Sequence, residues 1–247
     1  MMDFFKGAAR WVRYIWRYIL FINDFILFKK QDTTDNRFLL VWSNRYPCLN
    51  DKTSLTGFDR HYIYHPAWAA RVLAKKRPSE HVDIGSTLHF CTLVSAFVPV
   101  RFYDYRPAEI ELNNLASESA DLLDLPFEDN SIDSLSCMHV VEHVGLGRYG
   151  DPIDPLGDVK AMQELQRVLS VKGVLLFVVP VGKPKIMFNA HRVYSYEQIV
   201  GHFSSLNLVE FSLVPEHQND GGMKYNATAD DVAKEEYACG CFWFTKI

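Results

Sequence analysis

The sequence predicts an α/β protein whose open, mostly parallel sheet carries helices on both faces. Three stretches favour this fold class. Residues 81–85 read as a short apolar strand that ends on glycine, and the residues that follow have helical character. Residues 132–138 read as a second apolar strand after an acidic turn. Residues 174–179 are a near-continuous apolar run, which is typical of a parallel strand covered on both faces.

Length, charge and cysteine content narrow the class of protein. The 247 residues suffice for one α/β domain with an appendage. A net charge of −4 argues against a general nucleic-acid binder, which would be strongly basic. The five cysteines are odd in number and scattered, so we expect a reducing, cytoplasmic setting rather than a disulfide framework. Cys239 and Cys241 share one face of an expected strand, and we interpret them as core thiols.

The chain divides into three expected parts. Residues 1–35 are expected to form an aromatic-rich helix, and residues 79–247 the main domain. Residues 36–78 between them are expected to form a connector or lid and a lead-in helix. Pro66 is expected in the first turn of that helix. Segment 4–28 is too often interrupted by charge for a transmembrane helix or a signal peptide. Its charged side chains form one stripe, namely Lys6, Arg10, Arg13, Arg17 and Asp24. This pattern fits either peripheral contact with an anionic membrane or packing on the chain's own domain or a second copy.

Acidic residues near the ends of successive predicted strands point to a nucleoside-containing ligand. Asp83 and Gly85 lie where the first strand turns into a helix, a geometry that aims backbone N–H groups at a ligand. The next strand, residues 100–103, ends on Asp104, 21 residues after Asp83. This is close to the offset of about 20 residues at which an acid binds ribose hydroxyls in such folds.

The order of residues 119–143, SADLLDLPFEDNSIDSLSCMHVVEH, resembles the middle of class I S-adenosylmethionine (SAM) dependent methyltransferases. The resemblance covers about residues 80–247. It implies a Rossmann-like fold with a seven-stranded sheet, and SAM as the cofactor. Thr87 and His89 stand where this family has its second and third glycines. The cofactor-binding residues that the resemblance and the strand ends imply are Asp83, Gly85, Ser86, Asp104, Tyr105, Asp121, Leu122 and Met138.

Catalysis by such a protein requires positioning and, for a hydroxyl acceptor, a base. His139 is the first candidate base because it lies where the fourth strand ends, and His143 is the second. His191 is a third, and Arg192 could clamp an anionic or polyhydroxyl acceptor, since both follow the fifth strand. For each histidine a purely structural role is the alternative.

Two further signatures are interpreted as coincidental. Residues 139–143 spell H-x-x-E-H, a zinc-protease motif, but that chemistry needs a long helix and a further acidic ligand, so we expect no metal. Residues 145–150 spell G-x-G-x-x-G but do not sit directly between a strand and a helix. We expect them to form a flexible loop over the site.

Four stretches together, HYIYHPAWAAR, VDIGS, LPFEDNSIDSLSCMHVVEH and NAHRVYS, resemble a little-characterised bacterial family. It is catalogued as a domain of unknown function and is often encoded among surface-polysaccharide genes. The resemblance implies O-methylation of a saccharide or glycan precursor, with the N-terminal helix on the inner face of the cytoplasmic membrane. The alternatives are an inactive SAM-fold scaffold in glycan assembly, an enzyme that uses another nucleotide such as a nucleotide-sugar, and a lipid-surface binding protein.

Overall fold

The computed structural model describes residues 2–32 and 37–247, and within the first helix it describes side chains from residue 10 onward. The predicted stripe residue Lys6 and the predicted boundary at residues 35 and 36 lie outside what is described. Contacts divide the chain into two compact units, Met1–Gly57 and Phe58–Ile247, here called the N-terminal unit and the sheet unit. The sheet unit therefore begins upstream of residue 79 and includes the helix that leads into the first strand.

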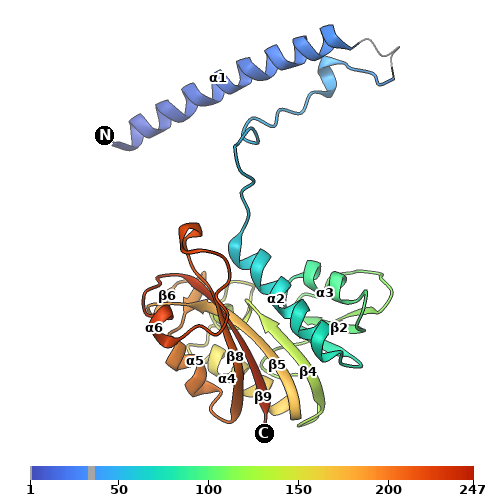
Figure 1. Ribbon diagram of the computed structural model, residues 1–247, viewed down its shortest axis with the longest axis vertical. Helices are drawn as coiled ribbons and strands as arrows, with labels where there is room; N and C mark the ends of the chain where they lie inside the picture. Colours follow the sequence, from blue (N-terminus) through green and yellow to red (C-terminus); the bar gives the residue numbers. More distant parts are fainter. Residues whose placement is uncertain (1, 33–36) are drawn as a thin grey trace. The chain divides into compact units, whose positions relative to one another are not determined.

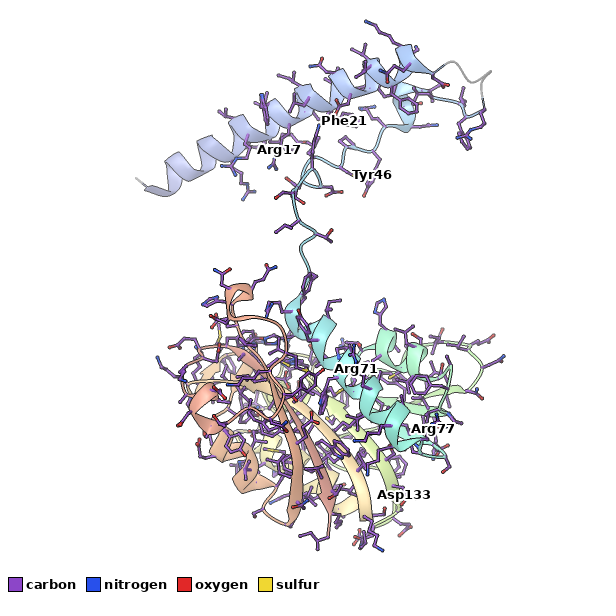
Figure 2. The ribbon with its side chains drawn as sticks, viewed as in Figure 1. Arg17, Phe21, Tyr46, Arg71, Arg77 and Asp133 are labelled. Carbon is purple, nitrogen blue, oxygen red and sulfur yellow. The ribbon has the colours of Figure 1, made fainter. Side chains whose placement is uncertain are left out.

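The N-terminal unit consists of a long helix and a short 3-10 turn. Helix α1 (Met2–Gln31) confirms the predicted helical extension, and the ring of Trp42 in η1 (Trp42–Asn44) lies 5.0 Å from that of Phe25. Arg17 donates to the Asn50 side chain, and Figure 2 shows Arg17 and Phe21 on α1. Large apolar side chains remain exposed on the helix, among them Trp11, Tyr14, Ile15, Trp16 and Ile19. Within the described residues, no helix is both long and apolar enough to cross a bilayer.

The sheet unit is built on seven strands in the order β3-β2-β1-β4-β5-β9-β8 (Figure 1). The strands are β1 (His81–Ile84), β2 (Val100–Asp104), β3 (Leu115–Ser119), β4 (Ile132–Met138), β5 (Leu169–Val181), β8 (Leu206–Val214) and β9 (Ala238–Lys246). Pairing from β3 through β5 is parallel, and β9 is antiparallel to both of its neighbours. The predicted seven-stranded, mostly parallel sheet is confirmed. A separate hairpin joins β6 (Lys185–Met187) and β7 (His191–Val193).

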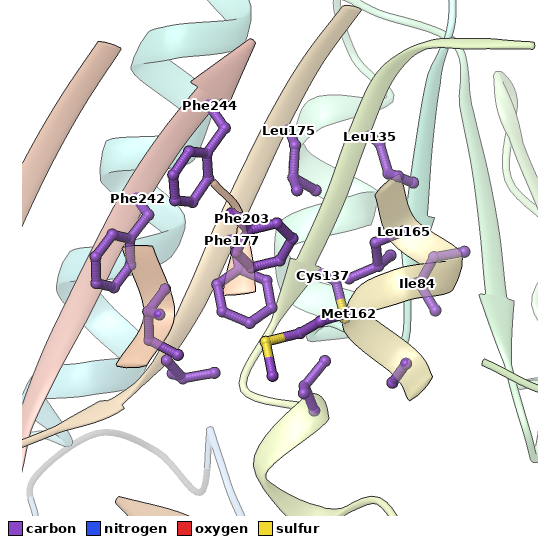
Figure 3. Close-up of a cluster of buried hydrophobic side chains, with 14 of the residues drawn as sticks. Ile84, Leu135, Cys137, Met162, Leu165, Leu175, Phe177, Phe203, Phe242 and Phe244 are labelled. Atoms are coloured by element: carbon purple, nitrogen blue, oxygen red, sulfur yellow. The ribbon is translucent and has the colours of Figure 1, made fainter. Parts of the chain in front are cut away.

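Helices cover both faces of this sheet, as predicted. Trp68 of α2 (Arg60–Lys76) and Phe90 of α3 (Leu88–Val94) share a buried cluster with Leu176 of β5. Phe203, which ends α5 (Tyr196–His202), packs in the other cluster with Phe177 of β5. Figure 3 shows this second cluster, in which α4 (Gly157–Val168) contributes Met162 and Leu165. The remaining short elements are η2 (Val141–His143), η3 (Gln218–Asp220) and α6 (Ala229–Val232).

Side-chain caps fix where the helices begin. Asp59 accepts the backbone N–H of Tyr62 and starts α2 at Arg60, so Pro66 lies inside the helix and its predicted place in the first turn is wrong. Ser195 and Gln198 form the predicted capping box of α5. Because α2 begins well before Pro66, its first turn adds aromatic and histidine side chains to the edge of the sheet where the parallel strands end.

Candidate functional site

The turn after β1 is shaped by one glycine in the left-handed region. Gly85 has φ +66°, and its N–H donates to the carbonyl of Tyr103 over 2.7 Å. An added Cβ at this position would lie 3.1 Å from Val140. Thr87, at the place of the family's second glycine, has φ −74° and accepts the N–H of Phe90, which caps α3. That backbone conformation needs no glycine, which accounts for the departure from the family's pattern.

A buried polar network lies beneath this turn. Asp83 accepts the N–H of Ser86 over 3.0 Å and the hydroxyl of Ser136, whose oxygen lies 2.8 Å from Nε2 of His81. Burial raises the pKa of Asp83 to about 6, although the hydrogen bonds from Ser136 and Ser86 oppose the rise. Asp83 lines neither cavity described below. It therefore positions the turn instead of meeting a ligand, which corrects its predicted role.

The first cavity opens at the carboxyl ends of β1 and β2. It encloses about 1000 Å³, including space open to solvent, and Gly85, Asp104, Tyr105, Asp121 and Leu122 are among its lining residues. One oxygen of Asp104, Oδ1, accepts the N–H of Arg106 over 2.7 Å. Asp121 likewise accepts the N–H of Leu123 over 2.8 Å. The structure thus brings together two of the three predicted carboxylates, those near the ends of β2 and β3.

The loop that spells G-x-G-x-x-G borders the first cavity. Its residues Gly145 and Tyr149 line that cavity together with Asp151. The Asp151 carboxylate accepts the N–H groups of Gly145, Gly147 and Tyr149 over 2.8, 3.2 and 3.1 Å. Desolvation opposes ionisation, but these donors outweigh it and lower the pKa of Asp151. The segment is therefore a loop, as expected, and not a dinucleotide-binding turn. The carboxylate of Asp151, which follows it, holds its backbone in place, in contrast to the flexibility that was expected.

A second cavity adjoins the first and is lined mainly by polar and aromatic side chains. The two share Gly85, His139, His143 and Tyr149. The predicted residues Ser86, Met138 and His191 line the second cavity. Arg148 and Tyr237 come from residues 144–158 and 215–238, the loops expected to shape an acceptor pocket. Other lining residues were not foreseen in this role, namely Tyr62, Thr87 and Glu142.

His139, the first predicted base, is held in a buried ion pair. Its Nδ1 lies 2.7 Å from Oε1 of Glu142, and the side chains are 3% and 1% exposed. Burial alone would lower the pKa of His139, but Cys239 and Glu142 act against it and raise the pKa to about 10. Burial favours protonated Glu142, yet the facing His139 outweighs this and lowers the Glu142 pKa. An imidazolium paired with a carboxylate is a poor proton acceptor.

The other two histidines differ in how their ring nitrogens are used. His143 has Nδ1 2.6 Å from the carbonyl of Ala190 and Nε2 3.8 Å from Oε1 of Glu142. His191 has a buried Nε2 with no hydrogen-bond partner among the described residues. Burial lowers the pKa of His191, so the ring is neutral and able to accept a proton. His191 thus lines the second cavity with a neutral ring.

Arg192 does not reach either cavity, in contrast to its expected role as a clamp. It is 5% exposed, its Nη1 donates to the carbonyl of Val144 over 2.7 Å, and its Nε lies 3.6 Å from Asp158. The side chain therefore ties the segment after β4 to α4. Arg148 lines the second cavity, where its Nη1 donates to the carbonyl of Ala190 over 3.1 Å.

Solved structures of methyltransferases share this architecture. N-methyltransferase NodS from Bradyrhizobium japonicum, in complex with S-adenosyl-L-homocysteine, is 15% identical with a TM-score of 0.53, and the match covers 81% of this chain and 91% of NodS. A Burkholderia thailandensis 1,6-didemethyltoxoflavin-N1-methyltransferase is 11% identical with a TM-score of 0.52, covering 74% and 78%. The likeness shows the fold, which is the Rossmann-like fold of class I methyltransferases.

Comparison by sequence shows the family. Uncharacterized protein MJ0638 of Methanocaldococcus jannaschii is 34% identical over 79 residues, which are 30% of this chain and 29% of that protein, so the match spans less than a third of the relative. A family model described as "Caenorhabditis protein of unknown function, DUF268" matches residues 108–233, just over half of the chain. The predicted link to surface-polysaccharide genes stays a prediction. The predicted membership of a family of unknown function is confirmed, and the chain belongs to the DUF268 family.

Proposed function

We propose that this protein is a SAM-dependent methyltransferase that transfers a methyl group to a hydroxyl of a saccharide. The observation that carries the proposal is the pair of adjoining cavities at the carboxyl edge of the sheet. Asp104 and Asp121 line the first cavity, and Gly85 and His139 are among the residues that it shares with the second. Open α/β sheets bind their ligands at this edge.

The first cavity suits the adenosine part of SAM. Oδ1 of Asp104 is used by Arg106, so Oδ2 is left to accept hydrogen bonds from ribose hydroxyls. Asp121 and Leu122 line the same cavity and supply an acceptor and a backbone N–H for the adenine edge. The methyl-bearing sulfonium, when bound, supplies an electrophile that needs little activation. Solved relatives of the same fold contain S-adenosylhomocysteine, which supports this choice of cofactor.

The second cavity suits a hydroxyl-rich acceptor. Tyr62, Tyr237 and Arg148 offer hydrogen-bond donors around its wall. Nε2 of His191 is buried and has no partner among the described residues. Turned toward the cavity, it takes the proton that a hydroxyl must lose as its oxygen attacks the methyl carbon. A polar wall with a neutral histidine favours oxygen acceptors such as those of a sugar ring.

Calorimetry with S-adenosylhomocysteine on the full chain tests the cofactor assignment. We expect saturable binding, weakened at least about tenfold in Asp104→Ala, because a charge-assisted hydrogen bond contributes about 1.5–3 kcal/mol. Asp133→Ala is the matched control, since Asp133 lies at the start of β4, at the opposite edge of the sheet (Figure 2). Absence of binding by the wild type, or binding of a UDP-sugar in its place, would refute the proposal.

Methyl transfer tests the acceptor assignment separately. Labelled SAM is incubated with the protein and with saccharide extracts, and the label in the glycan fraction is counted. Transfer is expected to fall about 100-fold or more in His191→Ala, the usual contribution of a general base, with S-adenosylhomocysteine affinity unchanged. Label that enters protein or lipid fractions alone would contradict a saccharide acceptor.

A further inference from the structure

Three buried side chains from distant segments converge beside the second cavity. His61 lies in the first turn of α2, His139 follows β4, and Cys239 lies near the start of β9. One ligand atom from each lies within 4.8 Å of the other two. Sheet pairing of Cys239 with Pro180 and Val214 holds it at the same edge as His139. A set of two imidazoles and a thiol binds zinc in preference to magnesium or calcium.

His139 and His65 each have one ring nitrogen in a hydrogen bond and the other without a partner among the described residues. Nδ1 of His139 is bound to Glu142, and its Nε2 is buried with no hydrogen-bond partner in the described part of the chain. The His61 ring is stacked against those of His139 and Tyr237, at centroid distances of 5.2 and 5.0 Å. Nδ1 of His65 lies 2.6 Å from the carbonyl of His61, while its Nε2 is likewise buried and unpaired among the described residues. Buried polar atoms without partners cost about 1–3 kcal/mol each, so two in one place call for an explanation.

We propose that His61, His139 and Cys239 bind a divalent transition-metal ion of the zinc type. Glu142 would orient His139 through Nδ1, in the carboxylate–histidine–metal arrangement common around zinc. Binding releases two protons to solvent, one from the Cys239 thiol and one from Nε2 of the His139 imidazolium. The Cys239 thiolate and the buried Glu142 carboxylate then balance the two positive charges. His65, whose ring lies 5.0 Å from that of His139, offers a donor for a fourth position.

Metal binding requires the three ligand atoms to move closer together. Zinc bound to nitrogen at about 2.0–2.1 Å and to sulfur at about 2.3 Å brings tetrahedral ligand atoms to about 3.3–3.6 Å of one another. Atoms at the present limit of 4.8 Å therefore have to approach by about 1.2–1.5 Å. The His61 ring is stacked on those of His139 and Tyr237, so it must also turn out of that stack for its nitrogen to face the ion. His139 is held in the left-handed region, at φ +58°, by its N–H bond to Val178. Such an unfavourable backbone conformation costs about 1–2 kcal/mol and is typical of functional positions.

Cobalt binding to the full chain tests the site independently of any methyl transfer. The protein is stripped with a chelator and titrated with Co²⁺, which reports thiolate ligation as a charge-transfer absorption in the near ultraviolet. We expect one equivalent to bind with this band, and Zn²⁺ to displace it. Cys239→Ser should abolish the band, and His61→Gln should weaken Co²⁺ binding at least about tenfold. Cys241→Ser is the matched control, because its sulfur lies 3.9 Å from that of Cys239 on the same strand.

The outcomes separate the metal site from the proposed function. A wild-type protein that binds Co²⁺ without a thiolate band, or not at all, overturns the inference whether or not S-adenosylhomocysteine binds. A band that disappears in Cys241→Ser but persists in Cys239→Ser also overturns it. Circular dichroism identifies any variant that fails to fold, and the His61→Gln titration and the wild-type stoichiometry then decide the question alone.

Discussion

Replacing Gly85 by alanine tests the packing at the centre of the site. The backbone there has φ +66°, where an L-residue costs about 1–2 kcal/mol relative to glycine. The added methyl would lie 3.1 and 3.2 Å from the two methyl groups of Val140, so these must shift by a few tenths of an ångström. We therefore expect the free energy of unfolding to fall by about 1–3 kcal/mol, or about 3–10 °C in melting temperature for a chain of this size.

A second effect of Gly85→Ala concerns the ligand. The methyl would lie 3.5 Å from Oδ2 of Asp104, the oxygen that we assign to the ribose. S-adenosylhomocysteine affinity should therefore fall at least about tenfold, since 1.4 kcal/mol of lost contact suffices for that change. Thermal denaturation and calorimetry on the same sample measure both effects.

Gly150→Ala is the control for backbone strain. Gly150 has φ +88°, but nothing lies within 4 Å of an added Cβ, so this variant carries the strain without the crowding. Gly85→Ala should be the less stable of the two. If the two variants unfold at the same midpoint and Gly85→Ala binds S-adenosylhomocysteine like the wild type, the close approach of Gly85, Val140 and Asp104 is wrong.

Three further predictions concern stability. The pKa of Asp83 is about 6 in the folded protein, against an ordinary value of 3.8. The free energy of unfolding should therefore fall by up to about 3 kcal/mol as pH rises from about 4 to 6, and it should stay lower above that range. Urea denaturation at several pH values should show this fall in the wild type but not in Asp83→Asn. Trp68→Phe removes the 2.8 Å hydrogen bond from Trp68 to Glu210 and should lower the free energy of unfolding by about 1–3 kcal/mol in the same assay. An unchanged free energy of unfolding would mean that α2 is held by apolar contacts alone. A chain that starts at Phe58 should unfold cooperatively at nearly the same midpoint, because the sheet unit is compact by itself; a broad transition would refute this.

Much of the sheet was predictable because its signals are local. Residues 132–138 form β4 as predicted, since an apolar run bounded by polar turns is a strong strand pattern. Asp104 and Asp121 meet in one cavity because parallel strands present their carboxyl ends at the same edge. β3 went unpredicted because only Leu115 of its five residues is buried, so this edge strand lacks an apolar signature.

The errors concern side-chain direction and long-range contact. Arg192 lies on the short hairpin strand β7, which has no recognisable sequence pattern. The direction of its side chain therefore could not be predicted. His61 and His65 are four residues apart on α2, a spacing that puts both on one helix face and that a search for metal ligands would notice. Their relation to Cys239 and Glu142 depends on how α2, β9 and the segment after β4 pack, which no local pattern encodes.

The strand order explains why two cavities share one border. Counting from β1, the chain adds β2 and β3 on one side and β4 and β5 on the other, so the switch point of the sheet lies between β1 and β4. Gly85 follows β1 and His139 follows β4, and both line both cavities. On one side of this point the sheet supplies carboxylates, and on the other β4 and β9, together with α2, supply histidines, tyrosines and a thiol. A methyl group bound at the border would face both sets, which is the arrangement that transfer between two ligands requires.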